Sequence, residues 1–397
     1  MNTKYCRLIK TLCTAFILCS VLAPTHAAEI QWQGFIAQGL IKTTDDSFVE
    51  FNDDISAHLT EVGINTRFRL APALRVAAQV VYLDGGNRYP HGARLDYLFI
   101  DWNFYSSLDW QANLYLGRFK NQHWLYSATR DVPFTRPSIV LPQSVYFDAF
   151  RDIAVSSDGA AFQARHSNAY GDFTFNWSYG ITPISDQQHR ILLGRDVLGK
   201  TSQNYDHKAS LYWQPELSRI NLGVSLIETG FSYKKQSEQN YTNAEFSVQR
   251  FMLHMGYQQE HWELALEVQQ ERLQFDGFFA PSFSQDHLGQ AGYLLFQYRP
   301  TVNWRWFSFI DYSVNNKDDR HGKHIAADSA GQIPDYFAYQ HTVASGFNVD
   351  LTAKLSLSAE VHWVKGVGRL SPIIVPDRVN NPTEYWQLYA LQLMYRF

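Results

Sequence analysis

The chain has 397 residues, of which 18% are charged and 15% are aromatic, with a formal net charge of −4. This balance gives no reason to expect nucleic-acid binding, so any basic patch must be local. The many aromatic residues and the negative mean hydropathy fit neither an ordinary soluble domain nor a helical membrane protein, because no apolar run after Ala28 is long enough for a membrane helix.

Residues 1–28 have the pattern of an export signal. Three basic residues precede the apolar run 12–22, and small residues follow, so cleavage is expected after Ala27 or Ala28. A retained transmembrane helix is the alternative, but the run is short and is interrupted by polar residues. The three cysteines, Cys6, Cys13 and Cys19, all lie in this segment. The mature protein would therefore contain no thiol, and its formal net charge would be about −7.

Residues 29–397 contain segments in which apolar and polar residues alternate, which is the pattern of a β-strand with one lipid-facing side. In segments 173–181 and 355–363 every second residue is apolar, and helical periodicity cannot produce this order. The alternation predicts sixteen strands, at about 31–41, 58–70, 73–83, 93–104, 109–119, 159–167, 172–181, 205–214, 219–229, 245–258, 262–272, 290–299, 304–313, 338–350, 355–364 and 385–397.

Short turns alternate with longer polar connections along the chain, as in an all-β, antiparallel, up-and-down barrel with short periplasmic turns and long external loops. A soluble β-sandwich is the alternative, but the strand lengths, the aromatic ends of the apolar faces and the even strand number favour the transmembrane barrel. Three strands, near 31–41, 93–104 and 290–299, alternate less cleanly. A loop folded into the lumen or a subunit interface would cover their additional apolar residues.

The final strand carries aromatic or apolar residues at alternate positions and ends on Phe397. This ending resembles the assembly signal of Gram-negative outer-membrane barrels. The resemblance implies that the barrel-insertion machinery recognises Tyr395 and Phe397, and that the protein resides in the outer membrane in contact with its lipid.

The longest connection, at about 120–158, falls in the third external position. Porins of sixteen strands fold a constriction loop into the lumen from this position, and the sequence resembles that family, general or phosphate-selective, over nearly its whole mature length. The resemblance implies passive diffusion of small hydrophilic solutes or ions, and assembly as a homotrimer. Segment 129–137 lacks the acidic motif associated with the general porins, which leaves the selectivity open.

Charged residues of this loop and of the inward face of the wall are the candidate filter. The loop candidates are Arg130, Asp131, Arg136, Asp148, Arg151 and Asp152. The wall candidates are Arg67, Arg69, Arg75, Arg165, Lys208, Arg250, Glu263, Glu267, Glu360 and His362. One hypothesis places the first three wall arginines opposite the loop aspartates. The three loop arginines and these wall arginines would then favour the passage of anions. The alternative is that the loop charges pair with each other and hold the loop's fold.

The sequence leaves other functions open beside that of a general porin. A channel specific for phosphate, a sugar or an acidic metabolite is the nearest alternative, and an adhesive barrel is another. An outer-membrane enzyme is disfavoured, because no Gly-x-Ser-x-Gly, phosphate-loop, Cys-x-x-Cys or His-Glu-x-x-His motif occurs. We expect no cofactor and no bound metal, although His321 and His324 lie in an acidic polar loop.

Overall fold

The computed structural model describes residues 30–237, 239–370, 372 and 374–397. The predicted export signal, residues 1–28, lies outside these ranges. The strands of the first half are β1 (Ile30–Thr43), β2 (Thr60–Ala71), β3 (Leu74–Asp84), β4 (Gly92–Ser106), β5 (Trp110–Lys120), β6 (Ser156–Asn168), β7 (Gly171–Ile181) and β8 (Gly199–Pro215). Those of the second half are β9 (Ile220–Lys235), β10 (Ala244–Gln258), β11 (Trp262–Gly277), β12 (Ser284–Thr301), β13 (Trp304–Val314), β14 (Tyr339–Asp350), β15 (Leu355–Lys365) and β16 (Tyr385–Arg396).

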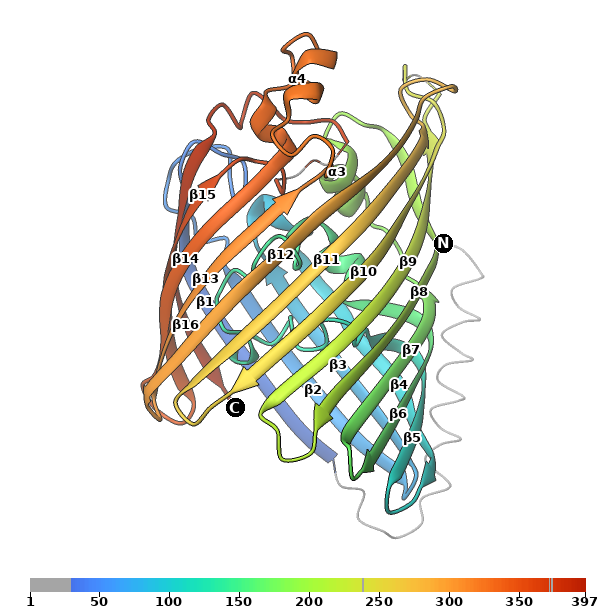
Figure 1. Cartoon of the computed structure of the whole chain (residues 1–397), viewed down its shortest axis with the longest axis vertical. Coiled ribbons are helices and arrows are strands. Elements are labelled where there is room, and N and C mark those ends of the chain that lie inside the picture. The colour runs from blue at the N-terminus through green and yellow to red at the C-terminus, as the bar shows by residue number, and fades with distance from the viewer. Residues whose placement is uncertain (1–29, 238, 371, 373) are drawn as a thin grey trace, which may run out of the picture.

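The sixteen strands form one closed, antiparallel barrel in which sequence neighbours pair and β1 pairs with β16 (Figure 1). Closure continues to the last residue, because the backbones of Gly34 and Phe397 exchange two hydrogen bonds of 3.0 Å. The predicted fold class and all sixteen predicted strands are confirmed. Recognition of Tyr395 and Phe397 by the insertion machinery stays a prediction.

The connections at one end of the barrel are short turns, and those at the other end are long (Figure 1). The long connections contain the helices α2 (Arg151–Ala154), α3 (Asp186–Leu193) and α4 (Lys323–Asp328) and the 3-10 turns η1 (Gly86–Arg88), η2 (Pro133–Thr135), η3 (Asp148–Phe150) and η4 (Asp335–Ala338). None of the helices among the described residues is long and apolar enough to cross a membrane.

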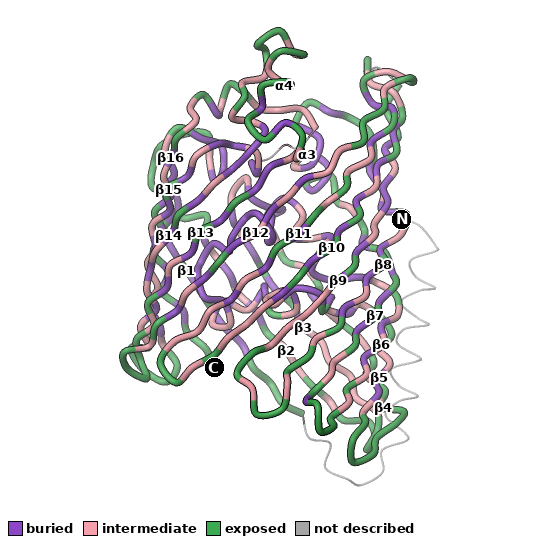
Figure 2. The backbone as a smooth tube through the Cα atoms, viewed as in Figure 1, coloured by how far each residue is buried: buried purple, intermediate pink, exposed green. Residues whose placement is uncertain are grey.

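Burial follows the two-residue alternation that the sequence predicts (Figure 2). On β15, Trp363 points outward and is 47% exposed, whereas its neighbour His362 is 4% exposed on the inner face. On β7, Trp177 points outward and Asn176 is buried inside. An outward apolar face and an inward polar face are the arrangement of a barrel that is surrounded by lipid.

A β-bulge explains the irregular pattern of β4. The register between β3 and β4 shifts opposite Gln79 and Val80, so Leu95 and Leu98 both point outward although they are three positions apart. The irregular strands β1 and β12 have another cause. Their inward apolar residues, such as Phe35 and Leu295, are covered by residues of the connection between β5 and β6.

Because alternation assigns each strand residue to a face, an arginine should be tolerated on one face and not on the other. Ile100→Arg, on the outer face of β4, should lower the free energy of unfolding in lipid vesicles by about 2–4 kcal/mol. Asn103→Arg, on the inner face of the same strand, is the matched control and should change it by less than about 1 kcal/mol. Equal losses for the two variants would contradict the assigned faces.

Candidate functional site

The connection between β5 and β6, residues 121–155, packs against opposite sides of the inner wall. Trp124 and Tyr146 belong to a buried apolar cluster with residues of β9 to β14. Val132 and Phe134 pack on a second cluster formed by β1, β3 and β16, and the rings of Phe134 and Phe35 lie 6.5 Å apart. The segment therefore reaches across the barrel, as its position among the strands in Figure 1 also shows.

Two buried wall carboxylates hold the backbone of this segment. Glu360 on β15 accepts hydrogen bonds from the backbone N–H groups of Ile139, at 2.7 Å, and Val140, at 2.9 Å. Glu267 on β11 accepts from the backbone N–H of Leu125 at 3.0 Å and from the hydroxyl of Tyr146. Buried carboxylates need such partners, because an unpaired buried charge is very costly.

A third wall carboxylate, Glu61 on β2, pairs with two arginines of the segment. Both terminal nitrogens of Arg136 donate to Glu61, and Arg151 donates to it at 3.1 Å. Arg151 also pairs with Asp131 at 2.7 Å, and Lys120 at the end of β5 donates to Asp131 at 2.8 Å. These five residues form one continuous network that joins β2, the segment and β5.

A second ion-pair group lies beside this network. Asp148 accepts from Arg88, in the connection between β3 and β4, at 2.7 Å and from Arg130 at 2.6 Å. Burial by itself would raise the pKa of the Asp148 carboxyl, but the two guanidinium groups hold this pKa below its ordinary value. For the same reason Lys120 and Arg151 hold the pKa of Asp131 well below its ordinary value. Both carboxylates are therefore ionised at neutral pH.

These contacts contradict the hypothesis that Arg67, Arg69 and Arg75 face the aspartates of the loop. Asp131 and Asp148 have the partners given above, and Asp152 pairs with Arg94 on β4. The loop charges pair with one another, as the alternative expects, and they also pair with wall residues. Arg130, Arg136 and Arg151 are at most 5% exposed, so they are not open charges at a constriction.

The ten wall candidates divide into two groups by exposure. Lys208, Arg250, Glu267, Glu360 and His362 are all buried. Lys208 pairs with Asp206 and Arg250 pairs with Glu271, so these residues do not line an open passage. Arg67, Arg69 and Arg165 are exposed, whereas Arg75 and Glu263 are half-buried.

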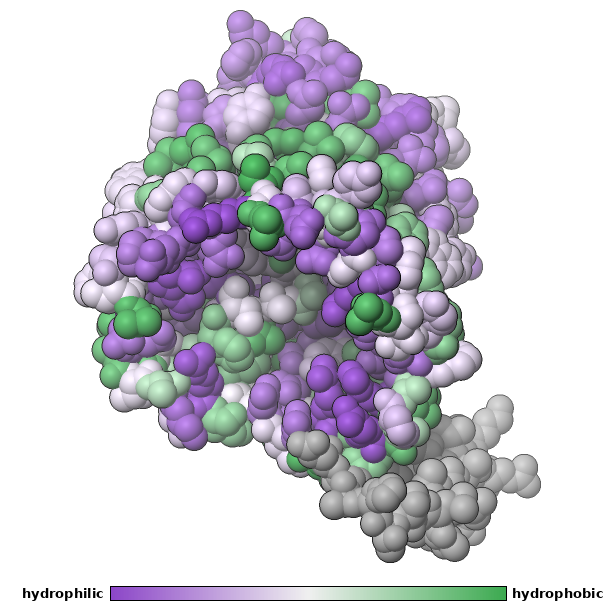
Figure 3. Space-filling view, turned by 60° about the horizontal axis from the view of Figure 1, so that its bottom comes forward, coloured by the Kyte–Doolittle hydropathy of each residue, from purple (hydrophilic) through white to green (hydrophobic). Residues whose placement is uncertain are grey.

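Among the described residues, the four arginines of the candidate set that are not buried have no side-chain partner, whereas Glu263 pairs with Arg299. In the described part of the chain, no side-chain hydrogen bond or ion pair joins the guanidinium group of Arg67, Arg69, Arg75 or Arg165 to another residue. Arg69 and Arg75 lie directly opposite each other on β2 and β3. Like charges in this position repel each other, so the barrel maintains an unfavourable arrangement of positive charge here. Figure 3, which shows the end of the barrel with the short turns, shows a hollow surrounded mostly by hydrophilic residues.

Several residues of the networks were not among the predicted candidates, namely Glu61, Arg88, Arg94, Lys120 and Asp96, which also pairs with Lys120. Glu61 follows the same alternation on β2 as Arg67 and Arg69, so the face assignment would have identified it. Arg88 lies in a connection, where alternation gives no information.

Ser225, His254 and Glu267 have the order of a Ser-His-acid triad. The Ser225 hydroxyl lies 2.9 Å from Nε2 of His254, and Nδ1 of His254 lies 2.5 Å from Glu267. However, Ser225 is 1% exposed and donates to the backbone carbonyl of His123 at 2.7 Å. Its hydroxyl proton therefore holds the segment 121–155 to β9, and we interpret these three residues as a further anchor.

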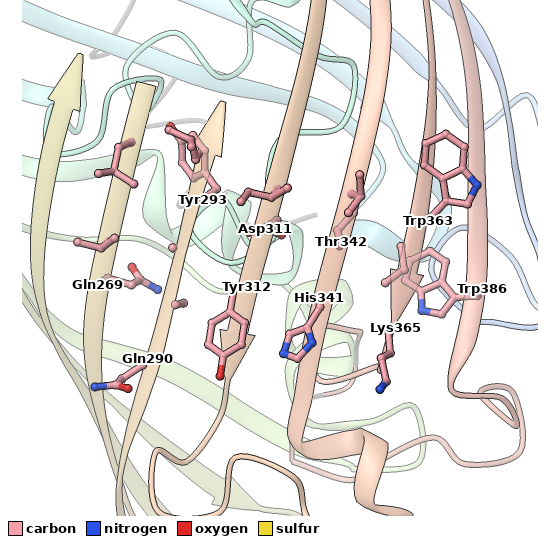
Figure 4. Close-up of a pocket in the computed structure, with 18 of the residues that line it drawn as sticks. Gln269, Gln290, Tyr293, Asp311, Tyr312, His341, Thr342, Trp363, Lys365 and Trp386 are labelled. Atoms are coloured by element: carbon pink, nitrogen blue, oxygen red, sulfur yellow. The ribbon is translucent and has the colours of Figure 1, made fainter. Parts of the chain in front are cut away.

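A groove of about 1060 Å³ lies on the outer wall over β10 to β16. Its floor contains outward apolar residues such as Ile310 and Val343. Figure 4 shows Tyr312 beside His341, whose rings stack 4.5 Å apart, and Lys365 on the next strand. Because these side chains point outward, the groove is not part of the lumen. Over the described ranges, no three His, Cys, Asp or Glu side chains gather as metal ligands.

Comparison with known proteins gives a likeness in structure and none in sequence. No family model and no curated protein matches the sequence. The structure is similar to OmpT of Vibrio cholerae, with a TM-score of 0.57 and 9% identity over 94% of this chain and 99% of that one. An anion-selective porin from Comamonas acidovorans has a TM-score of 0.57 and 10% identity over 93% of this chain and 100% of that one.

OmpF of Salmonella typhi, solved with daunomycin, also has a TM-score of 0.57, with 10% identity over 93% of this chain and 98% of that one. At these identities the likeness shows the fold alone. The chain is a porin-type β-barrel, the architecture of the Gram-negative outer membrane.

The network predicts that Glu61 is essential for holding the segment 121–155. Glu61→Gln removes the charge that neutralises Arg136 and Arg151 and should lower the free energy of unfolding by about 3–5 kcal/mol. Glu263→Gln is the matched control, because its partner Arg299 is 40% exposed, and the loss should be below about 1 kcal/mol. Unfolding of the refolded barrel in urea measures both. A Glu61→Gln variant as stable as the parent would refute this role.

Proposed function

We propose that this protein is an outer-membrane channel for passive diffusion of small hydrophilic solutes and ions, with a preference for anions. The observation that supports the preference is that acidic and basic residues of the inner wall differ in burial and pairing. The acidic residues Glu61, Glu267 and Glu360 are buried and paired, whereas Arg67 and Arg165 remain exposed and unpaired. The accessible fixed charge of the wall is therefore mainly positive, and fixed charge of one sign attracts ions of the opposite sign.

In this proposal the segment 121–155 is the constriction. Its contacts with Glu61 on β2, Glu267 on β11 and Glu360 on β15 involve distant strands of the ring. A segment held at several points around the wall keeps a fixed cross-section, because each anchor limits the displacement of the others. We therefore expect a constant single-channel conductance with little spontaneous gating.

The proposal predicts a measurable ion preference. In planar bilayers with a potassium chloride gradient, the parent channel should have a reversal potential on the anion-selective side. Replacing Arg67, Arg69 and Arg165 with Gln removes the exposed positive charge and should lower the chloride-to-potassium permeability ratio at least about twofold.

Arg272→Gln is the control for this experiment. Arg272 is exposed on the outer face of β11, where it pairs with Asp286, so its loss should leave the ratio unchanged. A triple variant with the permeability ratio of the parent would contradict the anion preference. Absence of conductance from folded parent protein would contradict the channel itself.

We also propose that the barrel is a homo-oligomer, and a trimer is the expected form. A trimeric form of OmpT from Vibrio cholerae shares the fold, with 9% identity and a TM-score of 0.56 over 94% of this chain and 100% of that one. Electrophoresis under mild detergent conditions should therefore show a high-mass band that heating converts to the monomer. A monomer band before heating, at every detergent concentration, would refute this assembly.

A further inference from the structure

A strip of three aromatic residues lies on the inner wall of β4 and β5. The rings of Tyr97 and Phe99 are 5.6 Å apart, and those of Phe99 and Tyr115 are 5.4 Å apart. All three side chains are half-buried, so part of each ring remains accessible from the lumen. The segment 121–155 does not cover them in the way that it covers the inward rings of β12 and β13, which are at most 2% exposed.

Arginines flank this strip on both sides. Arg67 and Arg75 come from β2 and β3, and Arg165 comes from β6. Arg67 is paired with Ala77, the neighbour of Phe99, and Arg75 is paired with Asp101, the neighbour of Tyr115. On the far side Arg165 is paired with Gln111, four positions before Tyr115 on β5. Asp101 lies opposite Arg75, but its carboxylate accepts a hydrogen bond from the side chain of Asn113, and no ion pair with Arg75 forms in the described structure.

Small residues leave room beside the central ring. Phe99 is paired with Ala77 on one side and with Gly117 on the other. Gly117 has a φ of +119°, and a Cβ atom there would lie 2.5 Å from the carbonyl oxygen of Leu98. The backbone thus requires glycine at this position, and no side chain fills the space next to Phe99 on that strand.

We propose that this wall is a binding site for organic anions that carry a flat ring, with aromatic carboxylates as the ligand class. The inference rests on the proposed channel function and names a solute class for it. A carboxylate suits the paired donors of a guanidinium group, and three arginines without protein partners are available. A flat ring suits the accessible faces of Phe99 and Tyr115. Only a ligand with both a carboxylate and a flat ring can use the arginines and the aromatic rings together.

A simple anion would use only half of this arrangement. Chloride or inorganic phosphate could bind to the arginines, but neither has a ring to place on the aromatic strip. A neutral aromatic molecule would leave the arginines uncompensated. The arrangement therefore predicts that benzoate binds more tightly than cyclohexanecarboxylate, which has the same charge and a similar size but no flat ring, and more tightly than phosphate.

Two measurements on the refolded full-length barrel test this site. Calorimetric titration in detergent measures binding of sodium benzoate, cyclohexanecarboxylate and phosphate directly. Block of potassium chloride current in planar bilayers measures the same binding within the channel. Benzoate should bind about three- to tenfold more tightly than cyclohexanecarboxylate, which is the preference that a stacked ring supplies.

Two variants separate the contributions of charge and ring. The double variant Arg67→Gln and Arg75→Gln should weaken benzoate binding at least about tenfold. Tyr115→Leu keeps an apolar side chain and removes one of the two rings of the site, so it should retain carboxylate binding and lower the preference for benzoate over cyclohexanecarboxylate. Arg272→Gln on the outer wall is the control, and a heat-dependent gel shift shows that each variant is folded.

The outcomes distinguish this inference from the channel proposal. Conductance without benzoate binding would overturn the site and leave the channel intact. Benzoate binding without conductance would support the site and overturn passive diffusion. Equal affinity for benzoate, cyclohexanecarboxylate and phosphate, or unchanged binding in the double arginine variant, would refute a site for ring-bearing anions.

Discussion

Closure of the sheet between β1 and β16 is the constraint on which the rest of this structure depends. Inside lipid, no water is available for the N–H and C=O groups of an open edge, so the ring must close. Closure then gives every strand one inner and one outer face. A shift of one residue exchanges the two faces, and the bulge in β4, which brings Leu95 and Leu98 to the same side, is a local case of that exchange.

The second constraint is the charge of the inner wall. Glu61, Glu267 and Glu360 point inward, where the segment 121–155 excludes water from them. Each one needs a positive group or several hydrogen-bond donors, and the segment supplies guanidinium groups and backbone N–H groups. Barrel and segment therefore depend on each other, since either one alone would leave unpaired charges.

The same pairing accounts for the charge that remains available to solutes. Arg136 and Arg151 of the segment neutralise the wall carboxylate of Glu61, Arg130 pairs with Asp148 of the segment itself, and all three arginines are buried. The arginines of β2, β3 and β6 have no such partners and stay accessible beside the aromatic strip. In the proposed channel, charge selection depends on which cations are left unpaired, and the number of cations in the sequence does not reveal this.

The sequence by itself determined the sixteen strands, their order and the face of most of their residues, because lipid on one side and water on the other impose a strict two-residue alternation. It also placed the longest connection in the third external position, where the resemblance to sixteen-stranded porins implies a loop folded into the lumen. Only the tertiary structure decided which charges meet. Arg151 and Glu61 are far apart in the chain, and the partner of a side chain in an irregular segment depends on where the backbone crosses the lumen, which no local periodicity encodes.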